Sequence, residues 1–318
     1  MRRKLSPFSP PLLAALAAAL AIPLALAGCA SGTSGPGSGG GGADAASVSI
    51  VASTNVYGDI ARTIAGDSAT VTSLIDDPDR DPHEYEATGR NQLAISKANI
   101  VIENGGGYDA FVDRMLHSAG RDDVVVLNVA TLSGRDQHPA EGEFNEHLWY
   151  DMPSMAKLAT ALADALVKAK PADADALHAN ERDFLASLAS LEKREAALKE
   201  AHGGAAVAIT EPVSLYMLEA AGLVNRTPKA FSEGIEEDSD VAPSVLRDML
   251  ALFDDRTVAA LIYNAQTEGP QTEAVLEAAK KNGIPRVPVT ETMPAGTHYS
   301  AWMRHNLDAI GSALGGGR

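Results

Sequence analysis

Two histidines and two glutamates stand in this 318-residue sequence at places where a ligand would bind. The histidines lie in predicted loops, and each glutamate directly follows an apolar run that is predicted to be a strand. In open parallel α/β sheets, ligands bind beyond the carboxyl ends of the strands. Imidazole and carboxylate groups both bind transition metals. The four residues are His83, His147, Glu211 and Glu291.

The spacing of these four residues matches no local metal-binding motif. An isolated histidine in a loop is usually a solvated side chain, and an isolated glutamate usually lies on the surface. The residue types and their places after strands therefore make them candidates for metal binding. The spacing does not by itself establish a site.

Strands and helices are predicted to alternate along most of the chain. The strands are short β-rich apolar runs at residues 48–52, 69–75, 100–103, 124–129, 205–210, 258–263 and 286–289. The helices have apolar residues at helical spacing, at 56–64, 88–98, 108–117, 154–169, 213–221, 243–253, 272–282 and 299–313. Thr88 is expected to cap the second of these helices, and residues 135–146 are predicted to be a loop. Such alternation is typical of βαβ units with a parallel sheet.

One further predicted helix, residues 173–201, is longer than the others. It contains no glycine or proline and is rich in alanine, leucine, glutamate and lysine, which favour helix. A helix of about 29 residues is roughly 43 Å long, which is enough to join two lobes. We therefore expect an α/β fold with two (βα)-type lobes, residues 47–152 and 204–318, joined by a helical linker at residues 153–203.

The beginning of the chain has the pattern of an export signal. Arg2, Arg3 and Lys4 precede an apolar stretch at residues 12–27, as in a secretory signal peptide. The stretch ends in Leu-Ala-Gly-Cys, which resembles a bacterial lipobox, and an uncleaved anchor helix is the alternative. Cys29 is the only cysteine, so the chain forms no internal disulfide, and lipid attachment gives this residue a role. We expect cleavage of residues 1–28 and a flexible Gly/Ser-rich tether over residues 29–46.

These signals predict an extracytoplasmic lipoprotein that is anchored to a membrane. The formal net charge of the whole chain is −16. An acidic surface disfavours nucleic acid and anionic lipid as partners and is compatible with cationic ligands. The membrane is therefore expected to be contacted only through the lipid on Cys29.

Several segments together resemble one family, the cluster A-I solute-binding lipoproteins. These are the zinc- and manganese-binding receptors of bacterial ABC importers. The resemblance covers nearly all of residues 48–314. Its two histidine motifs are Asp-Pro-His-Glu-Tyr-Glu at 81–86 and Glu-His-Leu-Trp-Tyr-Asp at 146–151. Further matching segments lie at residues 52–55, 104–107, 214–223 and 302–307.

The resemblance implies a C-shaped clamp with the metal site in the cleft between its lobes. By position, the implied ligands are His83 and His147 from the first lobe and Glu211 and Glu291 from the second. Thr290 is the alternative to Glu291, although a neutral hydroxyl is a poor ligand beside a carboxylate. Ligating histidines are usually oriented by hydrogen-bond partners, for which Asp151, Asn264, Glu84 and Asp81 are the candidates. Capping of turns is the alternative role for these four residues.

The implied function is that of a receptor, not an enzyme, which binds one divalent ion and delivers it to an ABC importer permease. A monomer is expected. Zn²⁺ and Mn²⁺ both accept histidine and carboxylate ligands, and carboxylates shift the preference toward harder ions such as Mn²⁺. Zinc-specific members often carry a His-rich loop before the second ligand, whereas residues 135–146 contain a single histidine, His138. Zinc receptors without that loop exist, so both metals stay open.

Three other classes of function compete with this interpretation. A metal-dependent hydrolase would need a base near the ion, and the sequence has no His-Glu-x-x-His motif because position 87 is Ala87. A lipoprotein that binds a siderophore or another organic ligand would need aromatic residues in its cleft, and aromatic residues make up only 5% of the chain. The sequence does not decide whether the chain is an adhesin.

Overall fold

The computed structural model describes residues 47–77, 85–121, 123–140 and 142–315. All of them belong to one compact unit, Asp44–Arg318. The expected signal peptide, Cys29 and the tether lie outside the described residues, and so does His83. No helix among the described residues is long and apolar enough to cross a membrane. Below, residues 47–152 are called the N-terminal lobe and residues 204–315 the C-terminal lobe.

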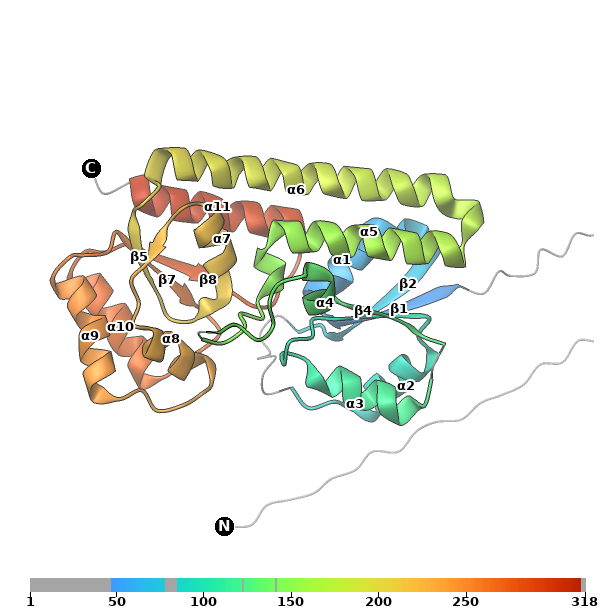
Figure 1. The fold of residues 1–318 in the computed structure, drawn as a ribbon, viewed down its shortest axis with the longest axis horizontal. Coiled ribbons are helices and arrows are strands. Elements are labelled where there is room, and N and C mark those ends of the chain that lie inside the picture. Colours follow the sequence, from blue (N-terminus) through green and yellow to red (C-terminus); the bar gives the residue numbers. More distant parts are fainter. Residues whose placement is uncertain (1–46, 78–84, 122, 141, 316–318) are drawn as a thin grey trace, which may run out of the picture. The chain divides into compact units, whose positions relative to one another are not determined.

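The N-terminal lobe contains a parallel sheet with the strand order β2-β1-β3-β4 (Figure 1). Its strands are β1 (Val48–Thr54), β2 (Ala69–Ile75), β3 (Ile100–Glu103) and β4 (Val125–Asn128). Its helices are α1 (Asn55–Ala65), α2 (Gly89–Lys97), α3 (Ala110–Ala119) and α4 (Val129–Ser133). Both faces of the central strands β1 and β3 are covered, so their residues are almost continuously buried. Thr88 caps α2 through a capping box with Asn91, which confirms the predicted start of this helix.

The C-terminal lobe repeats this arrangement with the strand order β6-β5-β7-β8, again all parallel. Its strands are β5 (Ala206–Ile209), β6 (Val224–Asn225), β7 (Ala260–Asn264) and β8 (Arg286–Val289). Its helices are α7 (Leu215–Ala220), α8 (Lys229–Glu236), α9 (Pro243–Asp254), α10 (Pro270–Lys281) and α11 (Tyr299–Gly315). The predicted α/β fold with two parallel sheets is confirmed.

Two helices connect the lobes, α5 (Met152–Ala169) and the 29-residue α6 (Ala174–His202). Figure 1 shows α6 running alongside α5 and α11, and α6 also contacts α1, so that one helix packs against both lobes. Its buried residues form one stripe at helical spacing: Leu177, Phe184, Leu188, Leu191 and Glu195. A single hydrophobic core extends from the strands of one sheet through these helices to the strands of the other. The predicted long helix is therefore confirmed.

Apart from short 3-10 helices, the sequence pattern missed three elements of the described chain, namely α4, β6 and α8. The strand β6 has two residues and the helix α4 has five, so neither is long enough to show a period. The helix α8 contains Gly234, which disfavours helix, and its apolar side of Phe231 and Ile235 spans one turn. The omission of α8 affects the site, because its last residue lies there.

Candidate metal site

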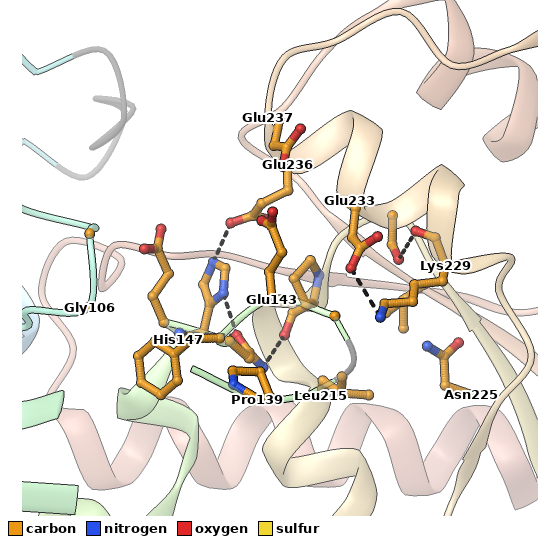
Figure 2. A pocket seen from close by; sticks show the side chains of 18 of the residues that line it. Gly106, Pro139, Glu143, His147, Leu215, Asn225, Lys229, Glu233, Glu236 and Glu237 are labelled. Carbon is orange, nitrogen blue, oxygen red and sulfur yellow. Dashed lines mark hydrogen bonds and ion pairs between the residues drawn. The ribbon is translucent and has the colours of Figure 1, made fainter. Parts of the chain in front are cut away.

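A cavity of 1070 Å³ lies between the two lobes (Figure 2). The N-terminal lobe contributes the turn after β3 and the predicted loop that leads to His147. The C-terminal lobe contributes the ends of β5 and β6 and the helix α8. The cavity is lined by Gly106, Gly107, Gln137, His138, Pro139, Gly142, Glu143, Phe144, Asn145, Glu146, His147, Ile209, Pro212, Leu215, Asn225, Thr227, Lys229, Ser232, Glu233, Glu236 and Glu237.

His147 is completely buried at the inner end of this cavity. The side-chain oxygen of Asn145 accepts a hydrogen bond from the backbone N–H of His147 at 3.1 Å and lies 2.9 Å from its Nδ1. The amide nitrogen of Asn145 donates to the carbonyl of Pro212, which fixes the amide with its oxygen toward His147. Nδ1 of His147 is therefore the protonated nitrogen, and Nε2 carries the lone pair that can bind a metal.

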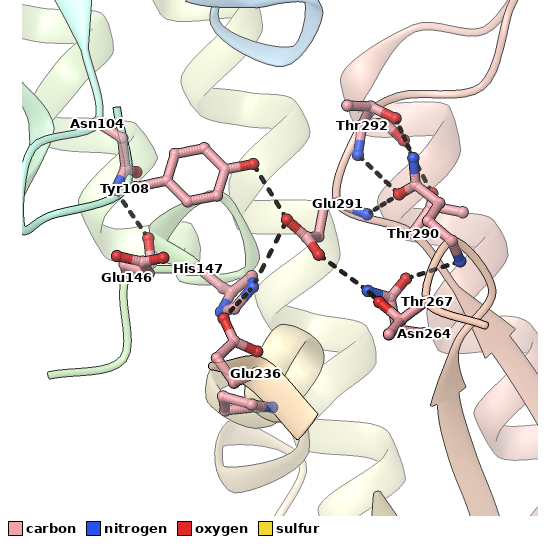
Figure 3. A network of polar contacts seen from close by, with 12 residues as sticks. Asn104, Tyr108, Glu146, His147, Glu236, Asn264, Thr267, Thr290, Glu291 and Thr292 are labelled. Carbon is pink, nitrogen blue, oxygen red and sulfur yellow. Dashed lines mark hydrogen bonds and ion pairs between the residues drawn. The ribbon is translucent and has the colours of Figure 1, made fainter. Parts of the chain in front are cut away.

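Two carboxylates face Nε2 of His147, one on each side (Figure 3). An oxygen of Glu236 lies 3.4 Å away and an oxygen of Glu291 lies 4.0 Å away. Glu291 was expected at the site from the sequence. Glu236 was not, because it lies at the end of the helix α8 that the pattern missed. The only signal for it is the run of acidic residues that follows Ile235.

Glu291 is buried and is held by residues of both lobes. Asn264, at the end of β7, donates from Nδ2 to Oε1 of Glu291 at 2.8 Å, and the hydroxyl of Tyr108 donates to Oε2 at 3.3 Å. The backbone N–H of Glu291 donates to the side-chain oxygen of Gln266 at 2.6 Å. The carboxylate is thereby fixed in one orientation beside His147 (Figure 3).

Thr290, the alternative ligand at this position, has a different role. Its hydroxyl donates to the carbonyl of Thr292 at 2.9 Å, and its own carbonyl accepts from the hydroxyl of Tyr150 at 2.8 Å. These bonds shape the loop after β8. Glu291, and not Thr290, is therefore the residue whose side chain lies beside Nε2 of His147.

Glu211 is 5% exposed at the end of β5. The next residue, Pro212, accepts the hydrogen bond from Asn145 that orients His147. The backbone next to Glu211 is thus connected to the loop of His147 across the lobes.

Asn264 and Asp151 are the two candidate orienting residues that the structure describes, and they make different contacts. Asn264 contacts Glu291 directly. Asp151 caps the start of α5 by accepting from the backbone N–H of Ser154, and it forms an ion pair with Arg135 at 2.7 Å. The guanidinium of Arg135 stacks over the ring of Tyr216 in the C-terminal lobe, 4.0 Å from the ring centre. Asp151 therefore supports the junction of the lobes at a different place from His147.

The outer wall of the cavity is acidic. Lys229 is 3.6 Å from Glu233 one turn later in α8, and Glu143, Glu236 and Glu237 lie near them (Figure 2). A hydrogen bond with Glu237 raises the pKa of Glu143. This surface attracts cations toward His147.

Among the described residues alone, no group of three or more His, Cys, Asp or Glu side chains is placed to hold a metal ion. His147 and Glu291 are brought together there. His83 falls in the segment 78–84, outside the described residues.

Comparison with known proteins supports the family resemblance. The family described as zinc-uptake complex component A, periplasmic, matches residues 50–313. The manganese-binding lipoprotein MntA of Bacillus subtilis is 26% identical over 288 residues, which cover 84% of this chain and 90% of MntA. The iron ABC transporter substrate-binding lipoprotein MtsA of Streptococcus pyogenes is 22% identical, over 86% of this chain and 90% of MtsA.

Solved structures have the same fold. The binding protein FpvC of Pseudomonas aeruginosa, in complex with Mn²⁺, superposes with a TM-score of 0.70 at 21% identity, over 86% of this chain and all of FpvC. The match of the family along most of the chain confirms the resemblance inferred from the motifs, together with the expectation that the protein is not an enzyme. The chain belongs to the zinc-uptake component A family, the substrate-binding proteins of bacterial ABC transporters.

Proposed function

We propose that this protein captures a divalent transition-metal ion in the cleft between its lobes and delivers it to an ABC importer permease. One observation carries the assignment of the site. Asn145 holds the ring of His147 so that the basic Nε2 points at the carboxylates of Glu291 and Glu236, in a place removed from bulk water. A buried imidazole between two carboxylates is well suited to a cation and is costly without one.

The proposed ligands are His83, His147, Glu211 and Glu291. Two neutral imidazoles and two carboxylates carry a charge of −2, which matches a divalent ion. Glu236 is a fifth candidate, because its carboxylate is the one nearest to Nε2 of His147. We propose that Glu236 can take the place of Glu211 in the metal's coordination.

The choice of metal depends on this donor set. Carboxylates can bind with both oxygens and raise the coordination number, which suits Mn²⁺. Zn²⁺ has the higher intrinsic affinity for such ligands. The relatives are named for manganese and for iron, and the family is named for zinc uptake. We propose Mn²⁺ or Zn²⁺ as the transported ion and include Fe²⁺ in the test.

Metal binding would stabilise the contact between the lobes, because the ion joins donors from both of them. The lipid on Cys29 would keep the receptor at the membrane beside its permease, after cleavage between residues 28 and 29. We propose that it acts there as a monomer. Changing Cys29 to Ser should release the protein from the membrane fraction without changing its affinity for metal.

Elemental analysis of the purified protein, followed by competitive titration with Mn²⁺, Zn²⁺ and Fe²⁺, tests the proposal. His147→Ala and Glu291→Ala should each weaken binding sharply in calorimetry. His138→Ala is the matched control, since this exposed histidine lines the same cavity and its ring makes no hydrogen bond to another residue that the structure describes. The proposal would be overturned by unchanged affinity in both ligand variants, or by the absence of stoichiometric metal together with no thermal shift for any of the three ions.

A further inference from the structure

The segment between β8 and α11, residues 290–298, belongs to the C-terminal lobe along the chain. It includes Glu291 and leads into α11. Its backbone is nevertheless hydrogen-bonded to the N-terminal lobe, mainly to the helix α1. The bonds to α1 begin two residues after Glu291 and continue to the first residue of α11.

Asn55, the first residue of α1, binds the backbone of Met293 twice. Its Nδ2 donates to the carbonyl of Met293 at 2.8 Å, and its Oδ1 accepts from the N–H of Met293 at 3.0 Å. Both residues are buried, with 6% of Asn55 and 8% of Met293 exposed. The amide group thus pairs with the backbone as a neighbouring strand would, and it fixes Met293 in both position and direction.

Asp59 lies one turn further along α1, on the same side of the helix as Asn55. One carboxylate oxygen accepts from the backbone N–H of Tyr299 at 2.8 Å, and the other lies 2.8 Å from Nδ1 of His298. Tyr299 is the first residue of α11, whose first N–H groups have no partner within the helix. Asp59 therefore caps α11 from the other lobe, and its negative charge is favoured at that helix end.

Two tyrosines of the N-terminal lobe complete this attachment next to Glu291, the proposed metal ligand. The hydroxyl of Tyr150 donates to the carbonyl of Thr290, and the hydroxyl of Tyr108 donates to the carboxylate of Glu291. Glu291 is therefore flanked on both sides of its backbone by hydrogen bonds to the N-terminal lobe. Its neighbours in its own lobe, Asn264 and Gln266, hold it from the opposite direction.

We propose that Asn55 and Asp59 are positioning residues, which set the metal affinity of the site by holding the Glu291 segment against the N-terminal lobe. The proposal rests on the proposed function, because it takes Glu291 as a metal ligand. Neither residue is one of the proposed ligands. Their effect is to keep a carboxylate from one lobe at a fixed distance from His147 of the other, so that the pair is already arranged when the ion enters.

A double-mutant cycle separates positioning from general stability. Affinities for Mn²⁺ alone and for Zn²⁺ alone are measured by calorimetry on the intact protein carrying Asn55→Ala, Asp59→Asn, Glu291→Ala, and each of the first two combined with Glu291→Ala. Asp59→Asn keeps one acceptor oxygen for the N–H of Tyr299 and replaces the oxygen that faces His298 with an amide NH2 group, so it is the milder variant if Asn55→Ala folds poorly. Asn180→Ala is the matched control, because Nδ2 of Asn180 also donates to a backbone carbonyl of α1, that of Ile64, at 3.1 Å.

Asn55→Ala should weaken metal binding by roughly tenfold to a hundredfold, the range for residues that orient metal ligands. Asp59→Asn should have a smaller effect in the same direction, and Asn180→Ala should leave affinity unchanged. In the Glu291→Ala background, Asn55→Ala and Asp59→Asn should cause no further loss of affinity, because the ligand through which they act is gone.

Two results would contradict the proposals, and they can be told apart. Unchanged affinity in Glu291→Ala would remove Glu291 from the site and overturn the proposed ligand set. A loss in Glu291→Ala, together with equal effects of Asn55→Ala in both backgrounds, would leave the ligand set intact and overturn the positioning role.

Discussion

Nε2 of His147, in the N-terminal lobe, lies 3.4 Å from a carboxylate oxygen of Glu236, at the end of α8 in the C-terminal lobe. The two residues come from separate lobes, and Glu236 ends a helix instead of following a strand. The contact places the end of α8 directly beside His147. It also makes Glu236 the carboxylate with the shortest path to an ion bound at Nε2.

The first prediction concerns this contact. Glu236→Gln keeps the size of the side chain and removes its charge, so it should weaken Mn²⁺ and Zn²⁺ binding by about tenfold or more if the carboxylate helps to hold the ion. Glu233→Gln, one turn earlier in α8 and paired with Lys229, is the control and should change affinity little. Calorimetry on both variants and on Glu211→Gln shows which carboxylate the metal uses. Equal affinities for Glu236→Gln and the unmodified protein would mean that Glu236 lies beside the site without binding the metal.

A second prediction concerns the tautomer of His147. Asn145→Ala removes the acceptor for Nδ1, so the ring can rotate and the proton can move to Nε2, where it blocks the metal. Affinity should fall by roughly tenfold to a hundredfold. Asn145→Asp keeps an acceptor oxygen and should retain more of the binding. Nitrogen-15 NMR of the imidazole reports the tautomer directly, and a proton that stays on Nδ1 in Asn145→Ala would contradict this explanation.

The main elements of the fold could be predicted because each has a period that the sequence shows. β2, β3 and β8 occur at the predicted residues, and α6 differs from the predicted long helix by a single residue at each end. The length of α6 could be predicted because no glycine or proline interrupts residues 173–201. The position of Glu291 followed from the end of β8, since ligands gather at the carboxyl ends of parallel strands.

The rest of the site depends on contacts between distant residues, which no local pattern contains. Glu236 was missed with its helix. Asn55 was noted only as part of a family motif, and its binding to Met293 joins residues that are 238 positions apart. Asn145 lies in a predicted loop, where an asparagine is ordinary. The side chains that orient the proposed ligands are thus the part of the site that required a structure.

A third prediction tests Asn264, which the sequence analysis named as a candidate orienting residue. Asn264→Ala removes the hydrogen bond to Oε1 of Glu291 and should weaken metal binding by about tenfold. The control is Thr267→Val, because Thr267 accepts from the same Nδ2 atom at 3.0 Å and its loss leaves the bond to Glu291 in place. Titration calorimetry with Mn²⁺ compares the two. A larger loss for Thr267→Val than for Asn264→Ala would show that the loop, and not the bond to Glu291, is what matters.

The last prediction concerns the pH dependence of stability and a residue far from any proposed ligand. Glu195 of α6 is 5% exposed, and burial, followed by the charges of Glu192 and Asp151, raises its pKa to about 8. The unfolded chain ionises this group near its ordinary pKa of about 4.3. Between these values the folded protein binds the extra proton, so this contribution to stability is complete below the unfolded pKa and is lost as the pH rises through 8.

Glu195→Gln keeps the protonated shape at every pH, so the variant should be more stable than the unmodified protein at pH 9. The difference should shrink toward pH 5, where both side chains are uncharged in the folded state. Thermal denaturation of the metal-free protein across this range measures the effect, with the exposed Glu200→Gln on the same helix as the control. A stability difference that is constant from pH 5 to pH 9 would mean that Glu195 is already ionised in the folded protein, and that its burial is balanced by a cation or a hydrogen bond in solution.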